Sequence, residues 1–419
     1  MRLLFLSPVG TLGGAERVLL TAVRGVLHER PGAVVRVVAL ADGPLAGAVR
    51  DLGAEVEVVA LPVDFAALGD SSRPGGRTAA ALRSLHRLPA LAQFVSRLRN
   101  RVARFAPDLV HSNGIKTHLL ARLVVPKGVP LVWHAHDFYG LRPLAGWLLR
   151  RSRARVKAVV AISNAVALDV RVILPGVPVR VVPNAVDLDR FCPGAGDGPE
   201  LDRLAGVPVA EPGTVRVGLV ATYARWKGHL TVLDAAARLA AEAPELRVRW
   251  YVVGGPIYQT AAQYTSAELS EAVAARGLGD RVVFVPFQTD TAAVYRALDV
   301  VVHASTAPEP FGLTIAEAMA CGRAGVVSAA GGATELFTDG IDALGFEPGN
   351  VGQLSAVIDR LVRDPELRER LGPAARQTAL ARFDALGYGG KLRDVYREVV
   401  IHRVPTSEPL GSRGAVHVR

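Results

Sequence analysis

The chain has 419 residues, half of them hydrophobic and 21% charged, an ordinary profile for a soluble protein with room for two buried cores. No apolar run approaches membrane-spanning length, and Cys192 and Cys321 lie too far apart for a metal-binding or disulfide spacing, as expected in a reducing cytoplasm. The net charge of +10 is uneven: residues 1–200 carry +11 and residues 201–419 carry −1.

The first half alternates strands with helices, as a parallel α/β sheet requires. The opening residues are too short for a signal peptide and are expected to form the first strand. The strands are predicted at residues 3–7, 33–40, 55–61, 109–111, 130–133 and 158–162, and the helices at residues 15–27 and 85–105. Residues 64–84 are expected to form a long loop.

A glycine-rich stretch, residues 10–16, separates the first strand from its helix. Glycine lets a backbone approach a ligand closely, but the Gly-x-Gly-x-x-Gly spacing of dinucleotide-binding loops is absent. By spacing alone, Gly13 and Gly14 therefore belong to a plain strand-to-helix turn.

Two histidines, His134 and His136, follow the strand at residues 130–133. Residues two apart on a strand face the same side, so the pair could contact one ligand. No third ligand of metal type is evident, and we expect no metal. The plain alternative is a histidine that caps the sheet edge.

Residues 142–157 interleave six basic side chains with leucines and Trp147. This pattern indicates a basic amphipathic helix that could lie on an anionic membrane surface. The commoner structural reading is a solvated arginine face on a core helix. A chain rich in arginine and poor in lysine can also reflect the base composition of its genome.

Residues 193–213 are rich in Gly, Pro and Asp and are expected to link the first α/β unit to a second one. The second unit is predicted to have strands at residues 215–221, 249–253, 282–285, 300–303 and 326–328, and helices at residues 351–364, 366–382 and 388–402. Glu335 is expected in the first turn of a helix. The tail, residues 403–419, is expected to be mobile.

Arg225 and Lys227 stand two residues apart just before a helix that is predicted to run to residue 241. Two cations at a helix N-terminus are a good arrangement for binding a diphosphate.

Two carboxylates, Glu309 and Glu317, stand eight residues apart around a predicted helix at residues 312–321. Pro310 disfavours a helical conformation at Glu309, which places that carboxylate on the loop beside the helix N-terminus. The free N–H groups of a helix start bind anions, and carboxylates accept hydrogen bonds from hydroxyls. A nucleotide sugar offers partners for both kinds of group: phosphates for the helix N-terminus, and hydroxyls on its sugar and its ribose for the two carboxylates. Alternatively, Thr314 and Glu317 have capping-box spacing, and Glu317 could simply hold the helix start.

The Glu-Pro-Phe-Gly and Glu-Ala-Met-Ala-Cys-Gly runs of this stretch resemble the Glu-x7-Glu motif of the retaining family-4 glycosyltransferases, which have the GT-B fold. The resemblance covers most of residues 1–402 and is strongest over residues 281–345. It implies two Rossmann-like α/β domains facing an interdomain cleft. The domains are expected at residues 1–192, joined by the helix at 388–402, and at residues 214–383.

The resemblance also implies roles for the candidate residues. Glu309 orients the donor sugar, Glu317 holds the ribose and His136 touches the sugar from the other wall. Gly13 and Gly14 belong to a glycine loop near the donor phosphates. The groups expected to stabilise the departing diphosphate are Lys227, Arg225 and the backbone N–H groups of Phe311, Gly312, Leu313 and Thr314.

The chain departs from the family pattern at two places. The usual phosphate-binding arginine would fall at Thr222, and Arg225 is expected to take its place. Ala185 replaces a glycine in a segment like Pro-Asn-Gly-Val-Asp, and alanine would be strained if that position needs a positive φ.

The expected function is retaining transfer of a sugar from a UDP- or GDP-linked donor to a hydroxyl of a glycan or lipid-linked acceptor, in cell-surface polysaccharide or glycolipid synthesis. The reaction is expected to need no metal or other cofactor, and no nucleic-acid partner is expected. The location is expected to be cytoplasmic, with an anionic inner membrane face as a candidate partner. The alternatives are a nucleotide-sugar 2-epimerase of the same fold and a non-catalytic nucleotide-sugar-binding protein.

Overall fold

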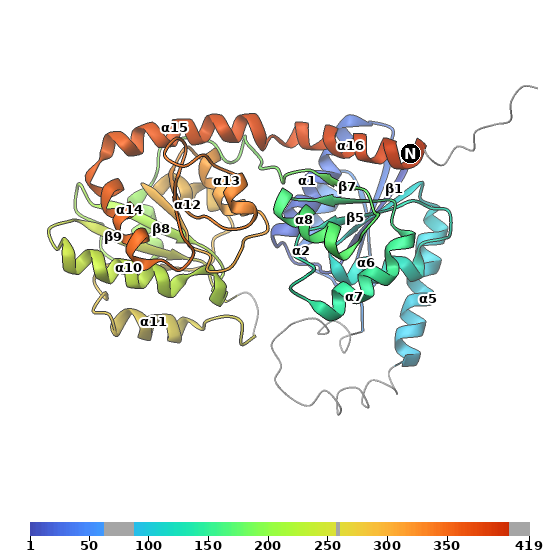
Figure 1. Ribbon diagram of the computed structural model, residues 1–419, viewed down its shortest axis with the longest axis horizontal. Helices are drawn as coiled ribbons and strands as arrows, with labels where there is room; N and C mark the ends of the chain where they lie inside the picture. Colours follow the sequence, from blue (N-terminus) through green and yellow to red (C-terminus); the bar gives the residue numbers. More distant parts are fainter. Residues whose placement is uncertain (63–87, 257–259, 402–419) are drawn as a thin grey trace, which may run out of the picture.

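The computed structural model describes residues 1–62, 88–256 and 260–401. These residues form two α/β domains, each built around one parallel sheet, as the sequence predicts (Figure 1). The predicted loop at residues 64–84 and the predicted tail at residues 403–419 lie outside the described residues. None of the helices in the described ranges is both long and apolar enough to cross a membrane.

The N-terminal sheet has seven parallel strands in the order β3-β2-β1-β4-β5-β6-β7. Its strands are β1 (Arg2–Ser7), β2 (Val34–Ala39), β3 (Glu55–Val58), β4 (Leu109–Asn113), β5 (Leu131–Ala135), β6 (Ala158–Ala161) and β7 (Val179–Val181). Its helices are α1 (Gly14–Glu29), α2 (Pro44–Asp51), α5 (Leu88–Phe105), α6 (Ile115–Val124), α7 (Pro143–Ser152), the 3-10 turn η1 (Arg153–Arg155) and α8 (Asn164–Ile173). The central strands β1, β4, β5 and β6 are mostly apolar and are buried on both faces, as a sheet covered by helices requires, and β4 and β5 also bury His111 and His134.

The C-terminal sheet has six parallel strands in the order β10-β9-β8-β11-β12-β13. Its strands are β8 (Val215–Val220), β9 (Val248–Val253), β10 (Val282–Val285), β11 (Val300–His303), β12 (Ala324–Ser328) and β13 (Leu344–Phe346). Its helical segments are α9 (Gly198–Leu204), η2 (Arg225–Lys227), α10 (His229–Glu242), α11 (Ser266–Ala274), α12 (Thr291–Ala297), α13 (Leu313–Ala320), η3 (Gly332–Glu335), α14 (Val351–Arg363) and α15 (Pro365–Arg382).

The strand orders fix where a ligand can bind. In the first sheet β1 lies between β2 and β4, and in the second β8 lies between β9 and β11. The chain therefore winds outward in both directions from β1 and from β8, which leaves a crevice beyond the carboxyl ends of these strands. The loops that follow β1, β4, β8 and β11 consequently carry the candidate site.

The predicted linker at residues 193–213 contains a helix, α9, which the sequence reading did not expect. Asp202 of α9 is fully buried and forms ion pairs with Arg216 at 3.0 Å and Arg249 at 2.8 Å, on β8 and β9. This part of the linker therefore packs against the C-terminal domain.

The last helix, α16 (Ala385–Ile401), returns to the N-terminal domain and packs along α1, while α15 covers the C-terminal domain (Figure 1). Gly25 of α1 and Gly389 of α16 approach so closely that a Cβ on either would lie 2.7 Å from the other's Cα. The Tyr396 hydroxyl of α16 also lies 2.8 Å from the His111 Nδ1 on β4. Helix α16 is thus part of the N-terminal core.

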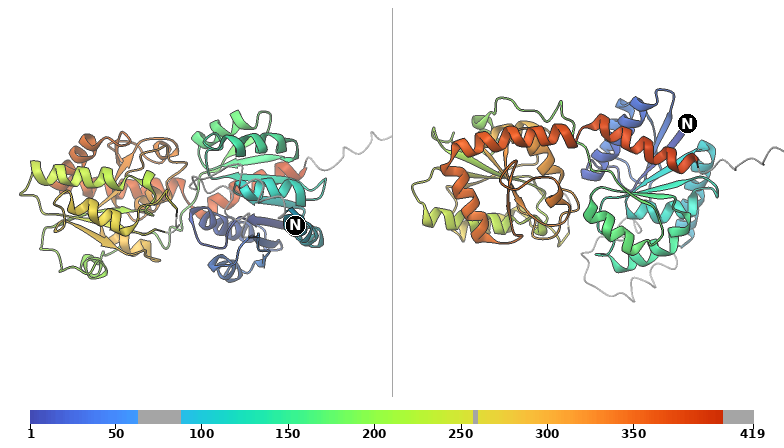
Figure 2. Two further views of the ribbon diagram at one scale, coloured as in Figure 1. Left: turned by 90° about the horizontal axis from the view of Figure 1, so that it is seen from below. Right: turned by 45° about the horizontal axis from the view of Figure 1, so that its top comes forward.

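The chain crosses between the domains twice, and the two crossings lie side by side. Val186 forms a parallel bridge with Asp384, and its N–H donates to the Phe383 carbonyl at 2.9 Å. Both views of Figure 2 show the domains joined through this narrow region. Ala185, next to the bridge, has no positive φ, so the strain that its substitution for glycine could cause does not arise.

Candidate active site

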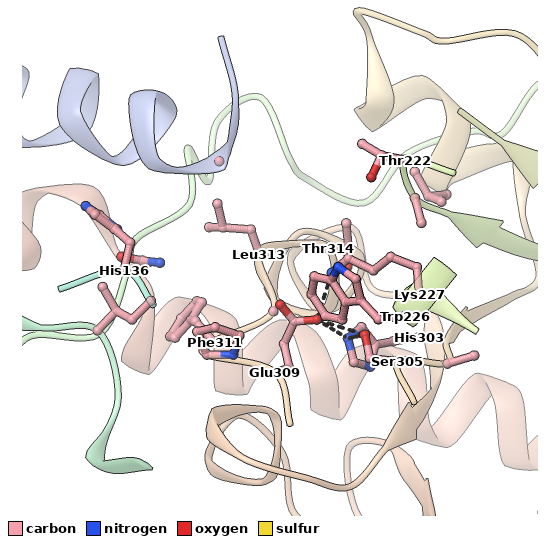
Figure 3. Close-up of a pocket in the computed structure, with 18 of the residues that line it drawn as sticks. His136, Thr222, Trp226, Lys227, His303, Ser305, Glu309, Phe311, Leu313 and Thr314 are labelled. Atoms are coloured by element: carbon pink, nitrogen blue, oxygen red, sulfur yellow. Dashed lines mark hydrogen bonds and ion pairs between the residues drawn. The ribbon is translucent and has the colours of Figure 1, made fainter. Parts of the chain in front are cut away.

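A cavity of about 500 Å³ lies between the two domains, at the carboxyl ends of the central strands (Figure 3). The N-terminal wall includes Gly14 and His136, and the C-terminal wall includes Lys227, Glu309 and the start of α13. The structure therefore brings most of the predicted site residues together around one space.

Glu309 lies on the loop after β11, at the back of this cavity, and only 7% of it is exposed. Its backbone is held in a parallel bridge with Gly331, through bonds from Glu309 N–H to Ala330 O at 3.2 Å and from Gly332 N–H to Glu309 O at 2.7 Å. This bridge fixes the loop, as two prolines around Glu309 suggest.

The Glu309 carboxylate is surrounded by donors. Its Oε2 accepts from the Lys227 Nζ at 2.7 Å and from the Ser305 Oγ at 2.9 Å, and it lies 3.0 Å from the His303 Nε2 (Figure 3). Burial by itself would raise the pKa of Glu309, but Lys227 and His303 outweigh burial and hold the pKa well below its ordinary value. Glu309 is therefore ionised. Because all three contacts are made by Oε2, Oε1 remains to accept a ligand hydroxyl.

Lys227 reaches the cavity from the turn η2, and its ammonium lies 3.9 Å from the centre of the Trp226 ring. The next residue, Gly228, has φ of +77°, and a Cβ there would lie 1.8 Å from the Ala304 carbonyl oxygen. Only glycine lets this turn pass so close to the end of β11. An ammonium has three N–H donors, and one serves Glu309, so two remain for an anionic ligand.

Arg225 does not join the cavity, and this part of the sequence prediction is corrected. Its guanidinium pairs with Glu268 of α11 at 2.6 Å, donates to the Ala261 carbonyl and lies over the Tyr264 ring. These partners hold Arg225 on the outer side of the turn. Thr222, where the family's usual arginine would fall, lines the cavity instead.

The first turn of α13 faces the cavity with Phe311, Gly312, Leu313 and Thr314. Gly312 is the N-cap, in a left-handed conformation with φ of +101°. A first-turn N–H has no carbonyl four residues earlier in its helix, so the Leu313 and Thr314 N–H groups can bind an anion. Leu313, Thr314 and Lys227 come from the same domain and line the same cavity (Figure 3).

Glu317 does not cap α13, because the N-cap is Gly312 and not Thr314. The capping-box interpretation is therefore wrong. Glu317 accepts a hydrogen bond from the Tyr295 hydroxyl at 3.0 Å and lines a second cavity of about 190 Å³ that also contacts Gly13, Gly14 and Phe287. Burial raises the pKa of Glu317 to about 7. A carboxyl that lines this cavity can accept hydrogen bonds from ligand hydroxyls.

His136 lies on the opposite wall (Figure 3), and Asn113 ties it to the glycine loop. The Asn113 Nδ2 donates to the Ala15 carbonyl at 3.2 Å, which turns its Oδ1 toward the His136 Nε2 at 2.5 Å. The His136 Nε2 therefore carries the proton, and Nδ1 remains an acceptor. Burial lowers the pKa of His136 to about 3, so the ring is neutral at physiological pH.

His134 and His136 lie on the same side of the chain, as predicted, with ring centres 4.0 Å apart. His134 is fully buried behind His136 and takes no part in the cavity surface. Within residues 1–62, 88–256 and 260–401 no three His, Cys, Asp or Glu side chains are placed to share a metal ion.

Three contributors to the site were missed by sequence reasoning: Tyr295, His303 and Ser305. Two of them could have been found. His303 is the last residue of a buried strand beside the crevice, as Asn113 is on β4, and Ser305 follows His303 by two. Polar residues at those strand ends are candidates by position alone.

Two glycosyltransferase family models match the chain, one for each domain. Residues 12–190 match Glycosyltransferase Family 4, and residues 209–378 match Glycosyl transferases group 1. Among curated proteins, the D-inositol 3-phosphate glycosyltransferase of Salinispora arenicola is 35% identical over 56% of this chain, and the match spans about half (52%) of that relative. The alpha-maltose-1-phosphate synthase of Mycobacterium tuberculosis is 28% identical over 71% of this chain and 80% of the relative.

Solved structures extend the likeness to both domains at once. HepE of Anabaena, in complex with UDP and glucose, is 27% identical with a TM-score of 0.77, covering 94% of this chain and 99% of that one. The sucrose-phosphate synthase of Thermosynechococcus elongatus shares the fold at 20% identity, with a TM-score of 0.74 over 96% of this chain and 100% of that one. The predicted fold is confirmed: the chain has the GT-B fold, and residues 12–190 and 209–378 each match a glycosyltransferase domain.

Proposed function

We propose that the protein is a retaining glycosyltransferase that moves a sugar from a UDP-linked donor to a hydroxyl of a glycan or lipid-linked acceptor. The observation that carries this proposal is the buried Glu309–Lys227 pair at 2.7 Å beside the open N-terminus of α13. It places a carboxylate for sugar hydroxyls next to an ammonium and free N–H groups for a diphosphate. The complexes of HepE with UDP, UDP-glucose and glucose support a uridine nucleotide as donor.

In this proposal the bond between the anomeric carbon and the diphosphate oxygen breaks while the acceptor oxygen bonds to the same face of the sugar. The charge that develops on the diphosphate is stabilised by the Lys227 ammonium and the first N–H groups of α13, which are already in place. The acceptor proton passes to the departing diphosphate oxygen, so no covalent intermediate on the protein is needed. The Glu309 carboxylate orients the sugar hydroxyls and remains ionised throughout.

The second cavity is suited to the nucleoside. Glu317 would accept hydrogen bonds from the ribose hydroxyls. Phe287 and Gly254, just after the ends of β10 and β9, line the same cavity. His136, held neutral with Nδ1 free to accept, would receive a hydrogen bond from a sugar hydroxyl on the opposite wall.

A basic surface on the N-terminal domain supports a membrane-bound acceptor. Leu144 and Trp147 of α7 are 73% and 50% exposed, and the Arg151 guanidinium lies 4.0 Å from the centre of the Trp147 ring. Helix α7 buries Gly146, Leu149 and Ser152, whereas Leu144, Trp147 and Leu148 point outward and are not part of the core. We propose that α7 docks on an anionic membrane.

A first experiment tests the overall proposal. The protein is screened for thermal stabilisation by UDP, GDP and their sugar conjugates, and then for nucleotide release with pooled glycan and lipid-linked acceptors. Selective stabilisation by UDP sugars, followed by acceptor-dependent UDP release, is the expected result. Conversion of the nucleotide sugar without any acceptor would instead identify an epimerase.

Glu309→Gln should keep the shape of the side chain but remove its charge. The variant is expected to fold and bind UDP, while the rate of sugar transfer falls by about two orders of magnitude or more, the range for a lost electrostatic contact. Steady-state kinetics and calorimetry with UDP measure the two quantities. Transfer at the wild-type rate would show that the donor sugar lies elsewhere.

Lys227→Ala should weaken UDP binding by about 1.5–3 kcal/mol, the scale of a charge-assisted hydrogen bond. The matched control is Arg225→Ala, two residues away, which should leave UDP affinity unchanged because Arg225 pairs with Glu268 outside the cavity. Titration calorimetry on folded variants measures both. Equal losses in the two variants would contradict the assignment of Lys227 as the phosphate ligand.

The affinity for a UDP sugar should rise with pH up to about 7 and then level off. Burial raises the pKa of Glu317 to about 7. As the pH rises toward 7, the carboxyl loses its proton, and in the unliganded protein the buried charge costs free energy. Ribose hydroxyls stabilise the carboxylate, so binding releases a proton below pH 7. The change is at most tenfold per pH unit. The diphosphate of a UDP sugar is esterified at both ends and does not titrate in this range. Glu317→Gln should therefore abolish the change of affinity with pH. If the affinity of that variant still rose with pH as in the wild type, Glu317 would not be the titrating group.

The α7 proposal is tested by co-sedimentation with vesicles. Binding should increase with the anionic lipid fraction, fall with added salt, and be lost in the double variant Arg150→Glu/Arg151→Glu. The double variant Arg97→Glu/Arg99→Glu on the exposed face of α5 makes the same charge change elsewhere and should keep binding. Equal binding of the wild type to neutral and anionic vesicles would contradict the proposal.

A further inference from the structure

A carboxylate of the C-terminal domain binds the N-terminus of a helix in the N-terminal domain. The Glu335 Oε2 accepts from the Asn164 N–H at 2.8 Å and from the Asn164 Nδ2 at 2.9 Å, and its Oε1 accepts from the Ala165 N–H at 2.8 Å. These three donors belong to the first turn of α8, where a negative charge is favoured by the helix dipole. In Figure 1, α8 lies on the side of its domain that faces the other one.

A second bond lies beside this contact. Ser163, the N-cap of α8, accepts from the Val166 N–H at 3.1 Å and donates from its Oγ to the Pro310 carbonyl at 2.7 Å. Gly332 fits beneath this bond, since a Cβ there would lie 2.2 Å from the Pro310 oxygen and 2.8 Å from the Ser163 Oγ. The two domains are therefore in close contact at this point. Four hydrogen bonds run from the start of α8 to the C-terminal domain, one to Pro310 and three to Glu335.

The two loops that α8 contacts are the ones that hold Glu309. Pro310 follows Glu309 directly, and the Gly332 N–H donates to the Glu309 carbonyl at 2.7 Å. The chain then runs three residues from Gly332 to Glu335. A movement of α8 relative to the C-terminal domain must therefore break bonds to the segment that positions the Glu309 carboxylate.

We propose that Glu335 is a positioning residue: its contact with α8 is a latch that holds the cleft closed, with the His136 wall facing Glu309. A donor must enter the cleft, so the contact must also open. Glu335 is only partly buried, and water can replace its donors when the domains separate. Loss of the latch should shift the protein toward an open cleft, in which His136 and Glu309 no longer face one sugar.

Loss of the Glu335 contact should open the cleft whatever the protein's function is. Its effect on turnover, in contrast, rests on the proposed function. The nucleotide is expected to bind mainly to the C-terminal wall, which the latch does not form. Glu335→Ala should therefore lower kcat by about tenfold or more, because misplacing reacting groups by about 1 Å can cost a hundredfold, while the dissociation constant of UDP changes less than twofold. A residue that only stabilised the fold would not separate these two quantities.

The test measures domain closure by small-angle X-ray scattering on the full chain, with and without UDP. Glu335→Ala should have a larger radius of gyration than the wild type, and Glu335→Gln, which keeps an acceptor but no charge, should lie between them. Glu366→Ala is the matched control, an exposed carboxylate at the start of α15, and should behave as the wild type in both scattering and kcat. Asn164→Ala removes one of the three donors from the other domain and should open the cleft in the same direction.

Several outcomes would overturn the latch. One is a radius of gyration for Glu335→Ala equal to that of the wild type, with or without a fall in kcat. Another is an increase in the radius of gyration of Glu366→Ala as large as that of Glu335→Ala. Should Glu335→Ala not fold, the same comparison is made with Asn164→Ala and Glu335→Gln. If the wild type transfers no sugar to any acceptor, the proposed function fails, while the scattering still decides whether Glu335 closes the cleft.

Discussion

The site depends on one buried ion pair. Glu309 and Lys227 come from loops 82 residues apart, and each needs the other, since an unpaired charge in a buried place would be costly. Without the ammonium, burial would raise the pKa of Glu309 with one fewer charge to oppose it, and without Glu309 the ammonium would lose its counter-ion. Ser305 and His303 complete the set of contacts around Oε2. The pair therefore holds two loops in place before any ligand arrives, which is the preorganisation that charge stabilisation requires.

The same pair explains why the glycines and the bridge around it are needed. Gly228 lets the Lys227 turn pass the end of β11, and the bridge between Glu309 and Gly331 fixes the other loop. These are backbone constraints. They fix the paths of the two loops and thereby the positions of the Lys227 ammonium and the Glu309 carboxylate. The opposite wall is built differently: His136 is neutral and oriented by a hydrogen-bonded chain through Asn113 to the glycine loop.

Much of the architecture could be predicted from sequence because it rests on local patterns. Strands β1 to β6 and β8 to β12 fall within a few residues of their predicted bounds, and α13 begins where Pro310 and Gly312 indicate. The edge strands β7 and β13 were not predicted, because each has only three residues and shows no clear pattern. The long-range pairings could not be predicted. Arg225 and Lys227 look equivalent as two cations on one turn, and only the position of Glu268 on α11 separates them. Likewise, Glu335 was expected in a helix turn, because nothing near it in the sequence reveals that α8 lies opposite.

The two adjacent chain crossings at Val186 and Asp384 have a consequence for the strength of contacts across the cleft. A short double tether keeps the two domains at a high effective concentration, so closure is an intramolecular step with a small entropic cost. Bonds between the domains then need little free energy to hold the cleft shut and little to release it. Two domains joined by one long flexible linker would need a larger and stronger interface to stay closed, and such an interface would slow product release. The connectivity of the chain thus lets a few hydrogen bonds decide whether the cleft is open or closed.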